Sequence, residues 1–460
     1  MMTQWQQQTI DQPEETMHFE SVRILEIDIT NPIPAIDVVH PVTDRIYRWA
    51  HVLVRIGRQP LGMLQVPLYA HGLSSEACTR FIWHELGPSI NEFLQEQGQP
   101  PITNLSIAGL PQNMFSNTYD QRDDVAPLVS IVIPTCRVPH RIFACVQKLL
   151  EQTYSRYEII IVDNGPEIMG IAEAVTNRFA YLPHIRCVRE TRRGSSWARN
   201  RGIEEAHGEI IAFTDDDVLV DRYWVAALVT AFGIDESVGC VTGLILPAEL
   251  ETSSQQWFEQ YGGFSKGFRR KIYNLTDHRP DDRLYPYSAG RFGAGANMAF
   301  RRSVLFEMGG FDPVLGAGAP TYGGEDLAAF FEVIVRGYQL AYEPGAMVYH
   351  CHRRDYRDLE RQLFGYGVGF VAFLLKCIMD DPHRLRDLIW KVPRGLWYAL
   401  SPMSSKNAGK QRGYPKELTQ IELYGMLCGP LAYMRSRWQV CSIRHQRNAV
   451  QNIVDPAYVP

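Results

Sequence analysis

Three consecutive carboxylates at residues 215–217 directly follow an apolar segment that runs from Ile210 to Phe213. The apolar segment predicts a buried strand, and a helical pattern opens at Asp221, so we expect the acids where a strand meets solvent. Each pair of adjacent anions costs on the order of 1 kcal/mol or more at a surface-like dielectric. A hard divalent cation with oxygen ligands is the natural counter-ion, and a solvated acidic turn is the alternative.

Length, charge and cysteine usage limit the possible functions. At 460 residues the chain is long enough for two or three domains. A hydrophobic content of 45% indicates an ordinary globular protein, and a formal net charge of -5 argues against nucleic acid as a partner. The nine cysteines form no CxxC pair, which indicates a reducing compartment. We therefore expect a cytoplasmic protein, with peripheral contact at the inner face of the membrane as the alternative.

The N-terminal part is expected to hold a tail and a small α+β module. Residues 1–20 lack the basic start and apolar core of a signal peptide and are expected to be a disordered tail. Alternating segments at 49–56 and 61–68 predict a hairpin, and helical spacing predicts a helix over 76–95. The module over 21–110 shows no catalytic pattern, so we expect it to pack against the rest of the chain or to contact a partner.

From residue 125 to residue 354, apolar strands alternate with single helices. The predicted strands of the first half are 128–133, 158–162, 185–189 and 209–213. This order predicts an α/β fold with a doubly wound, mostly parallel sheet and right-handed crossovers. Such sheets bind ligands at the carboxyl edge of their strands. The residues brought to that edge are Thr135, Asp163, the turn 192–195 and residues 215–217. This convergence predicts a nucleotide site.

An arginine-rich segment, residues 189–201, surrounds the start of the third helix of this pattern. Free N–H groups at a helix start favour an anion, and arginine forks favour phosphate. Arg199 and Asn200 are the strongest candidates for contact with such an anion because they lie one turn into the helix. A solvated basic face is the alternative.

Two later segments contain candidate substrate-binding or catalytic residues. The small-residue loop 290–297, which includes Gly295 and Asn297, would let the backbone approach a substrate, although an ordinary glycine turn has the same composition. Glu325 and Asp326 open a helix, where acids are either dipole partners or, in a cleft, a general base. The spacing leaves open which of the two carboxylates faces the cleft.

A predicted strand at 346–349 ends in His350, Cys351 and His352. Strand alternation places the two histidines on one face, so they are either metal ligands or structural residues. Beyond residue 354 the chain is helical and aromatic with interleaved basic residues, which fits either core packing or interfacial membrane contact. No membrane span is predicted, because Lys376 interrupts the longest apolar run.

Eight segments occur together in one order. They are 129–135, 161–164, 198–202, 215–217, 295–302, 309–312, 324–326 and His350. In this order they resemble the signature of family 2 glycosyltransferases of the GT-A fold. The resemblance covers about residues 128–354, so the module at 21–110 and a helical extension at 355–460 lie outside it.

The resemblance implies a binding site for a nucleoside-diphosphate sugar. Asp163 would bind the nucleobase, and Asp215 and Asp217 would form the DxD pair. Asp217 would hold Mg²⁺ or Mn²⁺ together with Asp215 and His350. The implied donor-binding residues are Thr135, Asp163, Arg199, Asn200, Asp215, Asp216, Gly295 and Asn297.

The resemblance also implies the reaction. Asp326, with Glu325 beside it, would deprotonate the acceptor hydroxyl, and a single carboxylate base without a second nucleophile suggests inversion. The acceptor would be a glycan, a polysaccharide or a lipid-linked precursor. The processive members usually carry a QxxRW motif and membrane spans, which this sequence does not show, so we expect transfer of one or a few sugars.

Two other functions fit parts of the sequence. A sugar-nucleotide pyrophosphorylase would need a glycine-rich segment directly after the first strand. The residues at that place are Pro134-Thr135-Cys136-Arg137, which include no glycine. An inactive nucleotide-sugar or metal-binding module would not need both the acidic triplet and the Glu325-Asp326 pair. A metal-dependent inverting glycosyltransferase is therefore the leading hypothesis.

Overall fold

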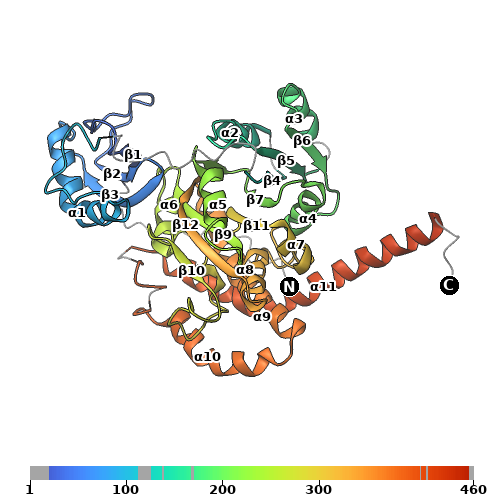
Figure 1. Ribbon diagram of the computed structural model, residues 1–460. Helices are drawn as coiled ribbons and strands as arrows, with labels where there is room; N and C mark the ends of the chain where they lie inside the picture. The colour runs from blue at the N-terminus through green and yellow to red at the C-terminus, as the bar shows by residue number, and fades with distance from the viewer. Residues whose placement is uncertain are drawn as a thin grey trace.

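The computed structural model describes residues 20–111, 126–136, 139–166, 170–404, 406–410 and 413–454. The expected tail lies outside these residues up to position 19, as does most of the linker after residue 110. The described residues form a small N-terminal sheet with one helix, a large sheet flanked by helices, and a helical C-terminal part (Figure 1). The expected fold class, an α/β domain with a mostly parallel sheet and a helical C-terminal extension, is confirmed.

The N-terminal module consists of β1 (Val22–Asp28), β2 (Trp49–Ile56), β3 (Gln59–Pro67) and α1 (Ser75–Glu96). β2 and β3 form the predicted hairpin, and β1 adds a parallel strand on the other side of β2. The side chain of Ser74 caps α1 by accepting a hydrogen bond from the Ala77 N–H.

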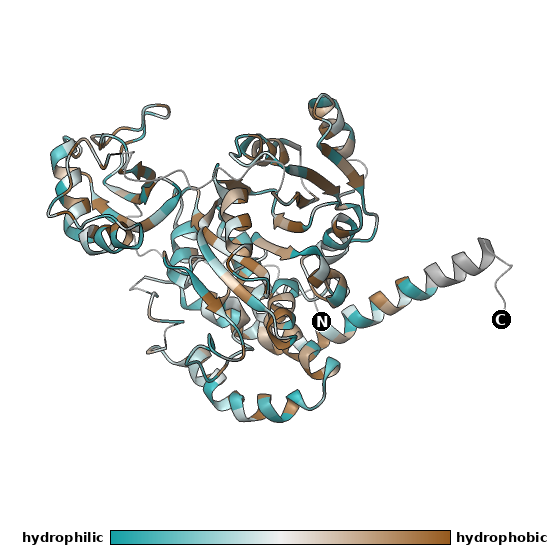
Figure 2. Cartoon of the chain, viewed as in Figure 1, coloured by the Kyte–Doolittle hydropathy of each residue, from teal (hydrophilic) through white to brown (hydrophobic). Residues whose placement is uncertain are grey.

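The large sheet has the strand order β10-β12-β9-β11-β7-β4-β5-β6, and β8 also pairs with β12. Its first half is built from β4 (Val129–Thr135), α2 (Pro139–Leu149), β5 (Tyr157–Asp163), α3 (Ile171–Phe179), β6 (Ile185–Arg189), α4 (Ser195–Glu205) and β7 (Ile210–Thr214). β6, β5, β4 and β7 are parallel, as predicted. Helices cover both faces, so these strands are nearly continuous runs of buried apolar residues (Figure 2).

The second half of the large sheet is mixed. Its elements are β8 (Val218–Val220), α5 (Trp224–Phe232), β9 (Val238–Pro247), α6 (Ser253–Tyr261), β10 (Lys271–Tyr273), η3 (Ala289–Arg291), β11 (Asn297–Arg301), α7 (Arg302–Met308), α8 (Glu325–Val335) and β12 (Gln339–His350). β11 is antiparallel to both β7 and β9. β8 pairs with the last residues of β12, with Val218 opposite His350. This pairing brings His350 beside the acidic triplet.

The C-terminal part consists of α9 (Tyr356–Asp380), α10 (Arg384–Leu400) and α11 (Lys416–Val454). α9 and α11 touch backbone to backbone: a Cβ on Gly367 would lie 2.1 Å from the Glu422 carbonyl oxygen, and one on Gly425 would lie 2.2 Å from the Phe364 carbonyl oxygen. Glycine is therefore required at both positions for this close approach.

The prediction that no segment could span a membrane is wrong in one respect. Among the described residues, α9 is long and apolar enough to cross a bilayer, judged by length and composition alone. A single lysine does not prevent this, and Lys376 forms ion pairs with Asp312 and Asp380. In the structure, α9 buries Leu359, Leu363 and other side chains inside the protein, so much of its apolar surface serves the core.

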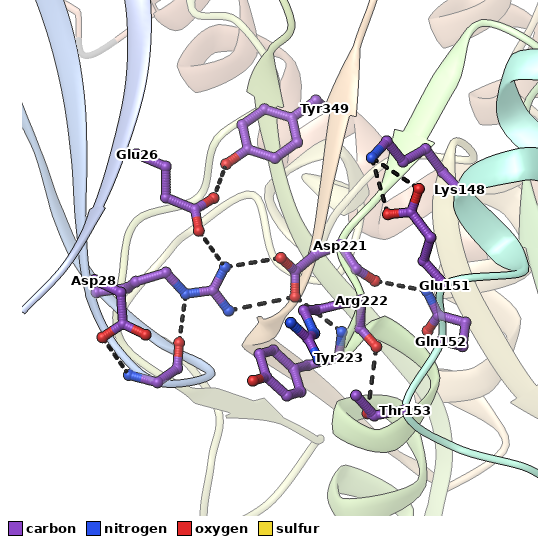
Figure 3. Close-up of polar contacts among 12 residues, drawn as sticks. Glu26, Asp28, Lys148, Glu151, Gln152, Thr153, Asp221, Arg222, Tyr223 and Tyr349 are labelled. Carbon is purple, nitrogen blue, oxygen red and sulfur yellow. Dashed lines mark hydrogen bonds and ion pairs between the residues drawn. The ribbon is translucent and has the colours of Figure 1, made fainter. Parts of the chain in front are cut away.

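A buried arginine fastens the N-terminal module to the large sheet. Arg55 on β2 donates to both carboxylate oxygens of Asp221, at 2.7 and 3.3 Å, and to Glu26 at 2.9 Å. Tyr349 on β12 donates to the other oxygen of Glu26 (Figure 3). Asp221 also accepts the Tyr223 N–H at the start of α5. The module therefore holds the segment that follows the acidic triplet.

The Arg55→Leu variant is expected to lose about 3 to 5 kcal/mol of unfolding free energy, because it leaves the carboxylate of Asp221 buried without its cation. Urea unfolding followed by circular dichroism measures this loss. Arg48→Leu is the matched control, since Arg48 on the same module forms an exposed ion pair with Glu20 and should cost less than about 1 kcal/mol. Equal losses in the two variants would contradict the anchoring role of Arg55.

Candidate active site

The carboxyl ends of β4 and β5 supply two of the predicted donor-binding residues. Asp163, the last residue of β5, is buried, forms an ion pair with Arg189 at 2.7 Å and accepts the Gly165 N–H at 3.0 Å. Thr135, the last residue of β4, donates its hydroxyl proton to Asp216 at 2.6 Å. Both side chains therefore lie where the sheet topology placed them, and the second one contacts the acidic triplet directly.

The three acids of the triplet contact different partners. Asp215 lies 3.3 Å from the Arg199 guanidinium, and its side chain is one-third exposed. Asp216 is buried against Thr135. Asp217 is buried too, with His350 at 3.6 Å and Arg353 at 3.4 Å. Burial, together with the charges of the neighbouring acids and against the opposing effect of Arg199, raises the pKa of Asp215 to about 6.

Arg199 joins the triplet to the acidic start of α8. Its guanidinium is buried and donates to Glu325 at 2.7 Å as well as to Asp215. Glu325 also accepts the Ser195 hydroxyl at 2.8 Å, so a carboxylate of the protein occupies the start of α4 where the sequence suggested a phosphate. Two neighbours of Arg199 are paired as well, Arg192 with Glu190 and Arg201 with Glu205.

Asp326, the second acid of the pair, is held by two backbone N–H groups. Its two oxygens accept the Gly295 N–H at 2.9 Å and the Leu327 N–H at 2.8 Å. Burial raises its pKa, and the charge of Glu325 raises it further, while Arg199 acts in the opposite direction. Gly295 lies close to both Arg199 and Asp326: a Cβ there would stand 3.2 Å from the Arg199 guanidinium and 3.4 Å from the Cβ of Asp326. The loop thus makes the close backbone approach that its composition suggested.

Four polar side chains link α6 to the acidic triplet. Glu259 lies 2.8 Å from His352 Nε2, the Nδ1 atoms of His352 and His350 are 2.9 Å apart, and His350 Nε2 is 3.6 Å from Asp217. With neutral rings, His352 donates its Nε2–H to Glu259 and accepts the Nδ1–H of His350. The lone pair on His350 Nε2 then faces a carboxylate oxygen.

A divalent cation fits this arrangement of donors. Two electron-pair donors, His350 Nε2 and a carboxylate oxygen of Asp217, face each other, and a cation between them would replace repulsion by coordination. The ligand set is not preassembled, because Asp215 turns toward Arg199. Within the part of the chain that the structure describes, no group of three His, Cys, Asp or Glu side chains is close enough to hold a metal ion.

Asn200 and Asn297 support the site through contacts with the protein itself. The Asn200 amide donates to the Phe311 carbonyl and accepts the Phe311 N–H, both at 2.8 Å. The Asn297 amide donates to the carbonyls of Leu244 and Ala346 and accepts the indole N–H of Trp224. These contacts give both side chains a structural role, and donor binding by either of them stays a prediction.

Glu259 and Lys266 were not predicted from the sequence. Glu259 had no visible signal, because its partner His352 is distant in the chain. Lys266 lies just after α6. Burial lowers the pKa of its amino group to about 8, and the charge of Asp326 acts in the opposite direction. The aromatic residues of this segment surround the histidines: the Phe258 ring is 4.7 Å from His352, and the Phe264 ring is 5.0 Å from His350.

Ionisation of Asp215 is expected to destabilise the metal-free protein. Because its folded-state pKa is raised, its contribution to stability is present below about pH 4 and is lost as the pH rises through about 6. We expect the Asp215→Asn variant to be more stable than the native chain by about 1 to 2 kcal/mol at pH 7.5, with no gain at pH 4. Urea unfolding in EDTA at both pH values measures the difference. A gain of the same size at both values would contradict the assignment.

Comparison with known proteins identifies the class of this domain. A parallel sheet whose carboxyl edge carries paired acids and a buried arginine is an arrangement suited to phosphate-linked substrates. Residues 130–309 match the family model described as Glycosyl transferase family 2. The chain therefore contains a family 2 glycosyltransferase domain, and the resemblance drawn from the eight segments is confirmed.

Curated relatives share this domain over part of their length. Glycosyltransferase AglE of Haloferax volcanii is 32% identical over 116 residues, which cover 24% of this chain and 38% of that protein. Glucosyl-dolichyl phosphate glucuronosyltransferase of the same organism is 26% identical over 177 residues, covering 37% of this chain and 51% of the relative. The chain thus spans 38% of the length of the first relative and about half of the second.

One solved structure with similarity to this chain is a mannosyltransferase from Pyrobaculum calidifontis in complex with GDP-Man and Mn²⁺. It aligns over 82% of this chain and 91% of its own, with 17% identity and a TM-score of 0.40. The family assignment rests on the sequence match alone.

Proposed function

We propose that this chain transfers a sugar from a nucleoside-diphosphate sugar to an acceptor hydroxyl, with inversion at the anomeric carbon and with Mg²⁺ or Mn²⁺ bound. The observation that carries this proposal is the position of Arg199. Its guanidinium contacts Asp215 of the triplet and Glu325, and Asp326 follows Glu325 directly. Carboxylates suited to a metal-bound diphosphate and a candidate base therefore belong to one site.

Each residue of the site has a distinct task in this proposal. Asp163 and Thr135, at the ends of adjacent parallel strands, would orient the nucleoside. Asp217, His350 and Asp215 would hold the cation, which would offset the charge of the departing diphosphate. Asp326 would accept the proton of the acceptor hydroxyl while the Gly295 and Leu327 N–H groups hold its carboxylate in place.

The contacts of Glu325 support inversion. A retaining double displacement needs a second carboxylate as nucleophile, and Glu325 is the neighbouring candidate. Its Oε1 atom accepts hydrogen bonds from both Arg199 and Ser195, and its side chain is buried. A carboxylate held in this way is poorly placed to attack a sugar, so one displacement assisted by Asp326 is the proposed course.

A panel of nucleotide sugars tests the proposal. The purified chain is incubated with each sugar and Mn²⁺, and the released nucleoside diphosphate is measured. We expect release from one donor or a small group of donors, and none after EDTA is added. Release that is unaffected by EDTA would rule out the metal, and no release from any donor with a range of acceptors would rule out the transferase.

The Glu259→Gln variant is expected to weaken Mn²⁺ binding by about 10- to 100-fold, the usual effect of losing a partner behind a metal-ligating histidine. Glutamine in place of the carboxylate no longer fixes which nitrogen of His352 carries the proton. Calorimetric titration with Mn²⁺ alone measures the affinity without relying on turnover. Glu236→Gln removes one exposed charge elsewhere and should leave the affinity unchanged. Equal affinities in the two variants would remove the Glu259–His352 pair from this role.

A lipid-linked acceptor is the more specific form of the proposal. The relative from Haloferax volcanii is named for action on a glucosyl-dolichyl phosphate, which is a lipid-linked sugar. The basic, aromatic C-terminal helices noted in the sequence would suit peripheral attachment at a membrane. Both features support a lipid-linked acceptor for this chain.

A further inference from the structure

The long helix α11 has two apolar faces, and only one of them serves the fold. Its inner face packs on α9 through Gly425 and Gly429, where a Cβ would collide with the neighbouring helix. Its opposite face carries five exposed large apolar side chains spaced alternately three and four residues apart, which we call the outer stripe. The outer stripe consists of Tyr424, Leu427, Leu431, Met434 and Trp438. Leu427 is 78% exposed and Trp438 is 72% exposed, so this face lacks cover within the described chain.

The helix α10 presents a second apolar face to solvent. On its protein side, Arg384 stacks on Phe331 and Leu388 is buried. Its exposed apolar residues lie mainly on one side, with Trp390 and Trp397 at the flank. The exposed set is Leu385, Ile389, Trp390, Val392, Leu396, Trp397 and Leu400. Trp390 is 86% exposed. Figure 2 shows apolar and polar residues alternating along both helices. A helix with this pattern and flanking tryptophans suits a membrane interface.

The charges beside these faces favour an anionic surface over a second copy of the chain. From Leu423 to Val454 the sequence contains arginines and no Asp or Glu, and Arg435, Arg437 and Arg444 are exposed. In α10, Arg386 and Arg394 are exposed as well. The chain as a whole has a formal net charge of -5, so this positive region is local. Two outer stripes packed together would bring like charges into contact, whereas anionic lipid head groups would neutralise them.

The same helices are fastened beside the candidate base. A Cβ on Gly369 of α9 would lie 2.8 Å from the carbonyl carbon of Gly323, and one on Gly324 would lie 2.5 Å from the Gly369 carbonyl oxygen. Asp326 follows two residues later. The α9–α11 pair therefore connects the outer stripe to the start of α8, where Asp326, the candidate base for the acceptor hydroxyl, is located. We call this part of the site its acceptor side.

We propose that the outer stripe of α11 and the apolar face of α10 dock this chain on an anionic membrane surface. Docking holds the acceptor side of the site at the lipid head groups, so the acceptor hydroxyl belongs to a membrane-anchored molecule. This statement about the acceptor rests on the proposed glycosyltransferase function, whereas the docking itself does not.

Flotation of the full chain with lipid vesicles tests the docking. We expect the chain to float with phosphatidylcholine vesicles that contain phosphatidylglycerol, to float less with phosphatidylcholine alone, and to be released by high salt. The double variant Trp390→Ser/Trp438→Ser should reduce the bound fraction at least about tenfold, and Arg435→Glu/Arg437→Glu should remove the preference for anionic lipid. Tyr181→Ser, which changes an exposed aromatic residue outside both helices, is the control and should float like the native chain.

Two results would overturn the docking proposal. One is failure of the native chain to float with anionic vesicles. The other is a dimer in vesicle-free solution, measured by light scattering, that the Leu427→Gln/Leu431→Gln variant converts to a monomer. All substituted side chains are exposed, so thermal melts should match the native chain and exclude misfolding. Release of nucleoside diphosphate is measured in parallel: flotation without release would refute the proposed function and leave the docking intact.

Discussion

The Asp326→Asn variant is expected to lower kcat for sugar transfer by about 10²- to 10⁴-fold and to leave donor affinity nearly unchanged. The amide keeps the shape of the carboxylate and can still accept the Gly295 N–H, but it cannot take a proton from the acceptor. The pKa of Asp326 is raised by burial and by Glu325, which makes it a stronger base than an exposed aspartate. Single-turnover kinetics for transfer and calorimetry for donor binding separate the two effects.

Asp277→Asn is the matched control for this experiment, because Asp277 is an exposed aspartate outside the site. It should transfer sugar at the native rate. If Asp326→Asn also turned over at the native rate, Asp326 would not be the base. If the variant instead lost donor affinity and transfer in parallel, its role would be in binding.

The Asp217→Ala variant is expected to abolish the stimulation of donor binding by Mn²⁺, a loss of about 10²-fold or more. Asp217 is buried between His350 and Arg353, and it is the triplet acid that faces the imidazole. Removing its carboxylate takes away the oxygen ligand and leaves the Arg353 guanidinium without this counter-ion next to the proposed cation site. Calorimetric titration of the nucleoside diphosphate, with Mn²⁺ and with EDTA, measures the stimulation.

The native chain provides the decisive comparison for the metal. Equal affinity for the diphosphate in Mn²⁺ and in EDTA would show that no cation takes part, whatever the variant does. Stimulation that persists in Asp217→Ala would move the metal to other ligands.

The large sheet could be predicted because its strands obey simple rules. Buried parallel strands are short apolar runs, and their carboxyl ends meet at one edge. Asp163 and Thr135 were therefore placed correctly before any contact was known, and the hydroxyl of Thr135 reaches the triplet 81 positions away. The pairing of β8 with the end of β12 could not be predicted in this way, because it is antiparallel and joins residues far apart in the sequence.

The roles of individual polar side chains were harder to predict. Glu325 and Asp326 are adjacent, and only the contact between Glu325 and Arg199, 126 positions earlier, shows which of them is held by a cation. Asn200 looked like a donor ligand because it lies near a helix start, yet its amide bonds the backbone of Phe311, 111 positions later. Partners at such distances in the sequence leave no local pattern.

The C-terminal helices show the same limit. Aromatic and apolar residues along α9 and α10 look alike in the sequence, and the two alternatives were core packing and membrane contact. The structure shows which positions are buried: Leu363 and Phe373 of α9 lie in the core, whereas Trp390 and Leu396 of α10 are exposed, and membrane contact through α10 stays a proposal. Close contact between α9 and α11 depends on glycines, which carry no hydrophobic signal.

The anomeric configuration of the product distinguishes a single displacement from a double one. The native chain is incubated with its donor, Mn²⁺ and an acceptor, and the anomeric proton of the transferred sugar is examined by nuclear magnetic resonance. We expect a configuration opposite to that of the donor, formed only with the metal and not by the Asp326→Asn variant. A product that retains the configuration of the donor would contradict a single displacement assisted by Asp326.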